Sequence, residues 1–210
     1  MQKTLPIMFM VAVVACSTKA DTTQSIDTLA TAQTASSTAE APIANSENAV
    51  APEVNPPGDI PDSQVFITYA NSAGGYTLKV PEGWARTENG SSVSFVNKFD
   101  GVKADVGVTS SGNRNAASVR ADEANRIKAQ GRAVSINAVS DVKLPAGNAV
   151  VIKYTSNSEP NAVTSKKVRL ENETYLFFRN GKEAMLTLWA PQGADNVDQW
   201  QLMAKSFRWK

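Results

Sequence analysis

An Asn-Gly pair between two strongly apolar runs is the feature that most limits what this chain can fold into. Residues 174–179 read Thr-Tyr-Leu-Phe-Phe-Arg, residues 182–189 read Lys-Glu-Ala-Met-Leu-Thr-Leu-Trp, and Asn180-Gly181 joins them. Asn and Gly accept the positive φ angles of a two-residue type I′ turn, so the pattern predicts a β-hairpin. In this register both faces of the hairpin carry large apolar side chains. We therefore expect each face of the sheet to be covered.

Two segments with helical periodicity can supply the cover. Between Asn115 and Gln130 small apolar residues recur every three to four positions, and Gly131 follows as a stop signal. A second amphipathic segment begins at Asp195, a good N-cap, and runs to about Phe207. Several short strand-like runs precede and separate these segments. The sequence therefore predicts an α+β domain, in which an antiparallel β-sheet is covered by helices on both faces as an α/β/α sandwich.

The N-terminus has the composition of an export signal. Residues 1–15 combine Lys3 with an apolar run of about eleven residues, and a membrane-spanning helix needs roughly twenty. Small residues precede Cys16, the only cysteine, as in the lipobox of bacterial lipoproteins. We expect cleavage before Cys16 and attachment of fatty acyl chains such as palmitate. This modification would leave no free thiol and would place the protein at the cell membrane or outer membrane, on the extracytoplasmic side.

The rest of the chain divides into a linker and a domain. Residues 16–62 are rich in Ala, Thr, Ser, Pro and acidic side chains and contain few large apolar ones, so they are predicted to form a disordered linker. Residues 17–62 carry one Lys against seven Asp plus Glu, a net charge of −6. Residues 63–210 carry nineteen Lys plus Arg against thirteen Asp plus Glu, a net charge of +6, and have the length of one domain.

The absence of histidine excludes several classes of enzyme. Without it the chain has no Ser-His-Asp or Cys-His arrangement and lacks the ligands of most zinc sites. Ser140 and Lys143 have the Ser-x-x-Lys spacing of some acyl enzymes, but they fall between strands rather than on a helix. The carboxylate pairs Asp122-Glu123 and Glu171 with Glu173 are interpreted as surface charge. We therefore expect no catalytic residue, metal site or cofactor.

The densest basic cluster consists of Lys166, Lys167 and Arg169. Lys167 and Arg169 alternate with apolar residues, which predicts the solvated side of a strand with Lys166 at its end. Binding of a phosphate or an anionic polymer is the functional alternative, and these three residues are the only binding candidates that the sequence offers. No aromatic residues are interleaved with them, so binding of nucleic acid is not expected.

Two segments resemble the PsbP-like superfamily. Gly75-Tyr-Thr-Leu-Lys-Val-Pro-Glu-Gly-Trp84 is similar to its opening strand and Pro-x-Gly-Trp turn, and the hairpin, helix and Lys205-Ser-Phe-Arg208 are similar to its end. The superfamily includes the extrinsic photosystem II subunit P, the Ran-binding Mog proteins and the LpqN lipoproteins. The resemblance implies an α/β/α sandwich that serves in binding or assembly. The histidine metal sites of photosystem members cannot be present here, so a photosynthetic role is not expected.

The leading hypothesis is a lipid-anchored extracytoplasmic domain without catalytic activity. It would be attached to the membrane through Cys16 and would engage a protein or an envelope component through a sheet edge or an open sheet surface. Two alternatives remain open at this point. One is an exported hydrolase that uses carboxylates or a Ser-Lys pair, and the other is a carrier of a small apolar or lipid ligand held between sheet and helix.

Overall fold

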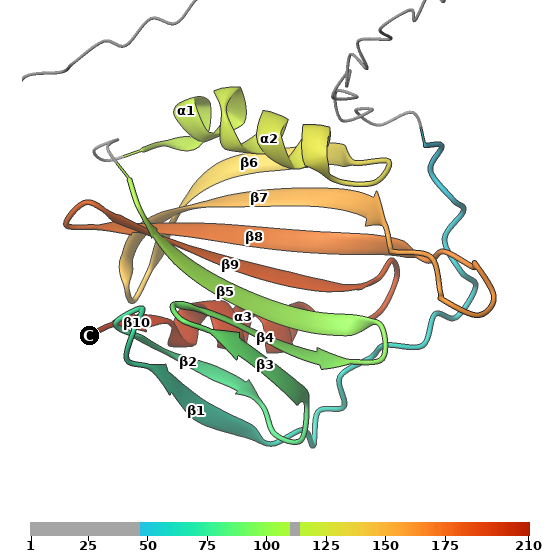
Figure 1. Ribbon diagram of the computed structural model, residues 1–210, viewed down its shortest axis with the longest axis horizontal. Helices are drawn as coiled ribbons and strands as arrows, with labels where there is room; N and C mark the ends of the chain where they lie inside the picture. The colour runs from blue at the N-terminus through green and yellow to red at the C-terminus, as the bar shows by residue number, and fades with distance from the viewer. Residues whose placement is uncertain (1–46, 110–113) are drawn as a thin grey trace, which may run out of the picture. The chain divides into compact units, whose positions relative to one another are not determined.

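The main feature of the fold is a seven-stranded antiparallel sheet (Figure 1). The computed structural model describes residues 47–109 and 114–210, which belong to one compact unit that begins at residue 41. In spatial order the strands are β3 (Ala85–Asn89), β4 (Ser92–Asn97), β5 (Asp100–Val108), β9 (Lys182–Pro191), β8 (Arg169–Arg179), β7 (Gly147–Asn157) and β6 (Ser135–Leu144).

The hairpin predicted from Asn180-Gly181 joins the central strands β8 and β9. Both turn residues have positive φ angles, 50° at Asn180 and 73° at Gly181, as a type I′ turn requires. Leu176 pairs with Met185, and Tyr175 pairs with Leu186. The predicted hairpin and its register are therefore confirmed.

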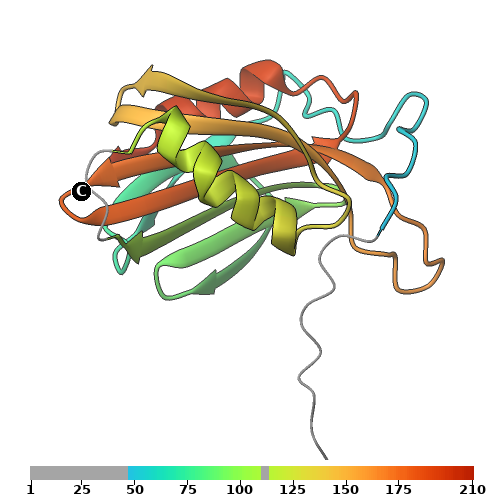
Figure 2. The same ribbon diagram turned by 90° about the horizontal axis from the view of Figure 1, so that it is seen from above.

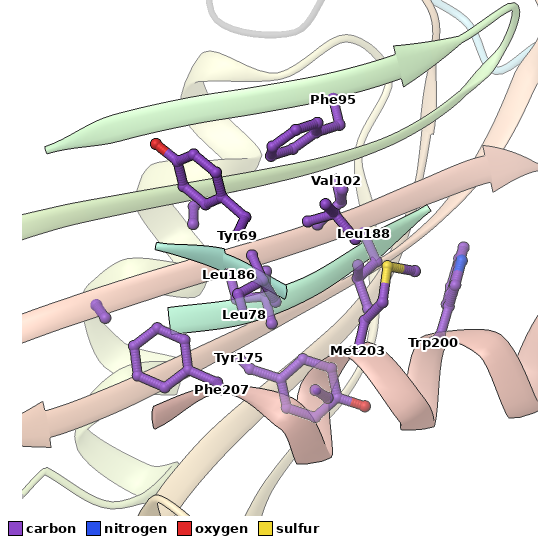
Figure 3. Close-up of a cluster of buried hydrophobic side chains, with 14 of the residues drawn as sticks. Tyr69, Leu78, Phe95, Val102, Tyr175, Leu186, Leu188, Trp200, Met203 and Phe207 are labelled. Carbon is purple, nitrogen blue, oxygen red and sulfur yellow. The ribbon is translucent and has the colours of Figure 1, made fainter. Parts of the chain in front are cut away.

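One face of the large sheet is covered by helix α3 (Val197–Ser206) and a small sheet. The small sheet consists of β1 (Phe66–Asn71), β2 (Tyr76–Pro81) and β10 (Arg208–Trp209). Figure 3 shows Met203 and Phe207 directed from the inner side of this cover into the core. The Phe207 ring stacks on Phe177 of β8 with centroids 4.3 Å apart and on Tyr76 of β2 at 5.6 Å. The three rings are fully buried and join the two sheets.

The other face is covered by two short helices, α1 (Ala116–Ala121) and α2 (Glu123–Gln130), which lie over β6 and β7 (Figure 2). The sequence predicted one continuous helix here. Asp122 interrupts it, because its carboxylate accepts the N–H of Glu123 and caps α2. Arg114 pairs with Asp122 and also with Glu183 of β9, so the break is tied to the sheet. Helices on both faces of an antiparallel sheet confirm the predicted α+β class.

The described structure includes residues that precede the predicted domain start at residue 63. Residues 47–62, here named the strap, run past the ends of β7 and β8 to the start of α3 (blue to cyan in Figure 1). Ile60 is only 4% exposed and belongs to the main core. The composition of these residues predicted disorder because it offers no apolar face. In the structure the strap is held instead by single polar side chains and by one apolar residue. The signal segment, Cys16 and most of the predicted linker lie outside the described residues.

The start of α3 also differs from the prediction. The helix begins at Val197, so its N-cap is Asn196 rather than Asp195. The Asn196 side chain does not cap the helix, because its Oδ1 accepts the N–H of Ile60 and its Nδ2 donates to the carbonyl of Gly58. The N–H of Asp195 donates to Asp59 instead. The beginning of α3 is therefore fixed by the strap.

A close contact between β5 and β9 yields a first prediction. The Trp189 ring lies against Gly101, and a Cβ atom at this glycine would be 1.9 Å from Cζ2 of the ring. Gly107 on the same strand has open space at the equivalent atom. We expect Gly101→Ala to lower the free energy of unfolding by about 1–3 kcal/mol through overpacking. The matched control Gly107→Ala should stay within about 0.5 kcal/mol of wild type. Urea titration measures both, and equal stability of the two variants would contradict the contact.

Candidate functional site

A groove lies between the first turn of α3 and strands β6–β8. Its volume is about 270 Å³, and we name it the α3 groove. Both walls contain polar and apolar groups. The residues used in the argument below are Lys153, Glu171, Glu173, Asn196, Val197 and Trp200.

The strand wall carries a carboxylate pair and a lysine. Glu171 and Glu173 are two residues apart on β8 and therefore point to the same face of the sheet. Lys153 is the cross-strand neighbour of Glu173 on β7, and its Nζ lies 2.5 Å from the Glu173 carboxylate. The hydroxyl of Tyr175 donates to the other oxygen of the same carboxylate. Glu173 is therefore held in place by two partners.

Glu171 has a different environment from Glu173. Burial, together with the neighbouring charge of Glu173, raises the pKa of the Glu171 carboxyl above its ordinary value. The backbone N–H of Gly193 and the charge of Lys153 act in the opposite direction. Glu171 thus takes up a proton more readily than a solvated glutamate and can either accept or donate a hydrogen bond in the groove.

The helix wall contributes aromatic and aliphatic surface. Trp200 is 6% exposed and packs into the core from the first turns of α3, while Val197 is 62% exposed. Asn196 is 1% exposed and is immobilised by the strap. An exposed valine beside fixed polar groups suits recognition of a ligand that presents both apolar and hydrogen-bonding surface.

The structure separates the residues of the serine hydrolase alternative. Ser140 and Lys143 both lie on β6, three residues apart, and the β-bulge of this strand lies before them, between Ile136 and Ala138. Side chains at odd separations along a regular strand point to opposite faces of the sheet. The lysine therefore cannot activate the serine.

The other carboxylate pair has structural roles. Asp122 caps α2, and Glu123 is 7% exposed and forms two hydrogen bonds with Arg126. In residues 47–109 and 114–210 no cluster of three or more His, Cys, Asp or Glu side chains could hold a metal ion.

The three predicted binding candidates contact the strap or the strands beneath it. Lys166 Nζ lies 2.5 Å from Glu53, and Lys167 Nζ lies 2.7 Å from Glu47. Arg169 is 5% exposed, so its interpretation as a solvated strand residue is wrong. Its guanidinium donates to the Ala133 carbonyl, to Asn157 and to Thr155. The three cationic side chains are thus engaged by the strap and by groups at this end of the sheet.

Only some of the residues that line the α3 groove could be identified from the sequence. Glu171 and Glu173 come just before the predicted hairpin and were interpreted as surface charge; they share a face because β8 already begins at Arg169. Trp200 lies in the segment that was predicted as an amphipathic helix, and its burial agrees with that pattern. Asn196 could not be identified, because its partners Gly58 and Ile60 are more than 130 residues away in the sequence.

The contrast between Arg169 and Lys166 yields a second prediction. Arg169→Met removes the donor of three buried or half-buried acceptors and should lower the free energy of unfolding by about 3 kcal/mol. Lys166→Met removes a surface ion pair from a side chain that is 67% exposed, and should cost less than about 1 kcal/mol. Thermal and urea unfolding of both variants measure the difference. Equal losses would contradict the structural role of Arg169.

None of the helices in the described part of the chain has the length and apolar character needed to cross a membrane. Comparison by sequence finds no matching protein-family model and no matching curated protein.

Comparison with solved structures finds distant similarity. One match is a protein from Bacteroides thetaiotaomicron, with 12% identity and a TM-score of 0.45; it covers 67% of this chain, which spans only 47% of the length of that protein. Cyanobacterial PsbP from Synechocystis has 14% identity and a TM-score of 0.47, covering 73% of this chain and 98% of its own. The Ran-binding protein Mog1p from Saccharomyces cerevisiae has 9% identity and a TM-score of 0.45, covering 70% and 96%.

These values carry no functional argument, and the fold class follows from the strand order and the helices described above. The proteins found include PsbP and Mog1p, two branches of the superfamily that the sequence resembles. The solved structures to which this chain is similar therefore include members of the PsbP-like fold.

Proposed function

We propose that this chain is a lipid-anchored extracytoplasmic domain without catalytic activity, which binds a protein or an envelope component in the α3 groove. The observation that carries the proposal is the composition of this groove. Its strand wall presents Glu171 beside the Lys153–Glu173 ion pair, and its helix wall presents exposed Val197 beside the fixed Asn196. Such a mixture supplies orientation through hydrogen bonds and affinity through apolar contact.

The same geometry supports recognition rather than catalysis. Hydrolysis of a glycosidic bond requires two carboxyl groups that flank the bond from either side. Glu171 and Glu173 are neighbours on one strand and belong to one wall of the groove. Glu173 is also engaged by Lys153 and Tyr175. Without the Ser140–Lys143 pair, the hydrolase alternative lacks an activated nucleophile.

The carrier alternative is not favoured by the packing of the core. It requires space between the sheet and a helix for a small apolar or lipid ligand. At the end of α3 this position is filled by Phe207, which stacks on Phe177, while Met203 is fully buried in the same cluster. A ligand there would have to displace closely packed rings.

The anchor is the part of the proposal that rests on the sequence alone, and it has a direct test. Wild-type protein from the native host should sediment with membranes, begin at Cys16 and carry the mass of acyl chains. Cys16→Ala should remain an uncleaved precursor without that mass, because no thiol is available for acylation. Cell fractionation and mass spectrometry of the intact protein measure both. A wild-type protein that begins at Met1 with an unmodified mass would refute the anchor.

The role of the α3 groove is tested by site-specific photocrosslinking in the native host. A photoreactive amino acid at Val197, which is 62% exposed at the groove, should capture a specific partner. The same group at Val108, which is 93% exposed on β5 beside Lys182 at the other end of the sheet, is the matched control. Glu171→Lys should reduce the capture at Val197 by tenfold or more, on the order expected for a reversed charge at an interface. Equal capture from both positions would refute the groove as the binding site.

A further inference from the structure

The strap covers a buried carboxyl group that lacks a hydrogen-bond donor. Asp100, the first residue of β5, is 6% exposed, and its Oδ1 has no hydrogen-bond partner among the described residues. Gly58 of the strap lies directly over this atom, since a Cβ atom on Gly58 would be 2.7 Å from Oδ1 and 2.8 Å from the Pro191 ring. Backbone of the strap is thus packed against a carboxyl oxygen that accepts no hydrogen bond.

The charges around Asp100 come from two neighbouring segments. The strap contributes Asp59, which is a like charge, and the turn between β4 and β5 contributes Lys98. Strand β9 contributes only the uncharged Pro191. Burial, and then the charge of Asp59, raise the pKa of the Asp100 carboxyl to about 7, with Lys98 acting in the opposite direction.

The strap is attached at two places that differ in chemistry. Its distal half, residues 58–62, is held by neutral hydrogen bonds of 2.7 and 2.8 Å between Asn196 and the backbone of Ile60 and Gly58. The N–H of Asp195 adds a bond of 2.8 Å to Asp59. Two residues of this half, Gly58 and Asp59, are neighbours of Asp100, so a charge on Asp100 would act on this half.

The proximal half, residues 47–53, is held by ion pairs. Glu47 binds Arg132 and Lys167 at 2.7 Å each, and Glu53 binds Lys166. Hydrogen bonds from Lys167 and Asn157 hold the pKa of Glu47 below its ordinary value. Lysine and arginine side chains keep their charge near neutral pH. This half is therefore held by ion pairs whose partners do not include Asp100.

From this arrangement we propose that the strap is a latch with one movable half: ionisation of Asp100 loosens residues 58–62 from the start of α3, while residues 47–53 stay attached. Loosening releases the side chain of Asn196, which lines the α3 groove. The latch is a property of the chain itself, so it holds whether or not the α3 groove binds a partner.

The direction of the pH dependence follows because Asp100 holds its proton more strongly when the strap is docked than when it is loosened. The docked strap favours protonated Asp100, and a solvated aspartate ionises near pH 4. Closure is therefore strongest at low pH, weakens as the pH rises from about 4 through 7, and stays weak above that. For this pKa difference, the population with a loosened strap should increase on the order of 10- to 100-fold between pH 5 and pH 8.

Hydrogen exchange of single backbone amides in the intact protein tests the latch. The reporter is the N–H of Ile60, which donates to Asn196. The N–H of Val50, which donates to Asn157, reports the proximal half, and Leu188 on the central strand β9 reports global unfolding. After correction for intrinsic exchange, the protection of Ile60 should fall about 10- to 100-fold from pH 5 to 8 and should stay below that of Leu188 at both pH values, while the protection of Val50 stays constant.

Three variants separate the latch from other effects. Asp100→Asn should keep Ile60 protected at both pH values, because the amide cannot ionise. Asp59→Asn should move the fall of protection to lower pH, since a like charge is removed from beside Asp100. Asp105→Asn, on the same strand but bonded to Ser92, is the control and should behave as wild type. Flat protection of Ile60 in wild type, an unchanged fall in Asp100→Asn, or a protection of Ile60 equal to that of Leu188, which would mean exchange only through global unfolding, would each overturn the proposal.

Discussion

The stacked rings of Tyr76, Phe207 and Phe177 hold the domain together. Phe177 belongs to β8 in the middle of the large sheet, Tyr76 belongs to β2 of the small sheet, and Phe207 connects α3 to β10. Because Phe207 lies between the other two rings, the two sheets and the last helix are fixed by one contact cluster. Aromatic pairs of this kind add to the free energy of burial of each ring. The position of α3, and with it the helix wall of the α3 groove, depends on this cluster.

The strap and the α3 groove share a component. Asn196 is held by Gly58 and Ile60 of the strap and also lines the groove. A polar side chain that is only 1% exposed cannot be released without a new partner, since an unpaired buried amide is costly. A change at the strap is therefore transmitted to the groove through one residue. This connection gives the latch a route to the proposed binding site without movement of the sheet.

Features with a local cause could be predicted from the sequence. The hairpin followed from Asn180-Gly181, and the helices on both faces followed from periodicity and from the two apolar faces of the hairpin. The break at Asp122 is also local, but an aspartate within a helical pattern does not by itself show whether it caps or continues the helix. The burial of Arg169 depends on Asn157 and on the carbonyl of Ala133, which no pattern connects to it. The strap was missed for the same reason, because its anchors Asn157 and Asn196 lie more than 100 residues away.

The point at which the strap begins also fixes the end of the sheet at which the chain enters the domain. Glu47 is fixed beside Arg132 and Lys167, next to the end of β7 and the start of β8. Strand β8 runs eleven residues from there to the Asn180-Gly181 turn, about 35 Å away at the usual rise per residue. The chain therefore enters the domain at the end of the sheet that carries Arg132, Lys166 and Lys167. The tip of the β8–β9 hairpin lies at the opposite end of this strand.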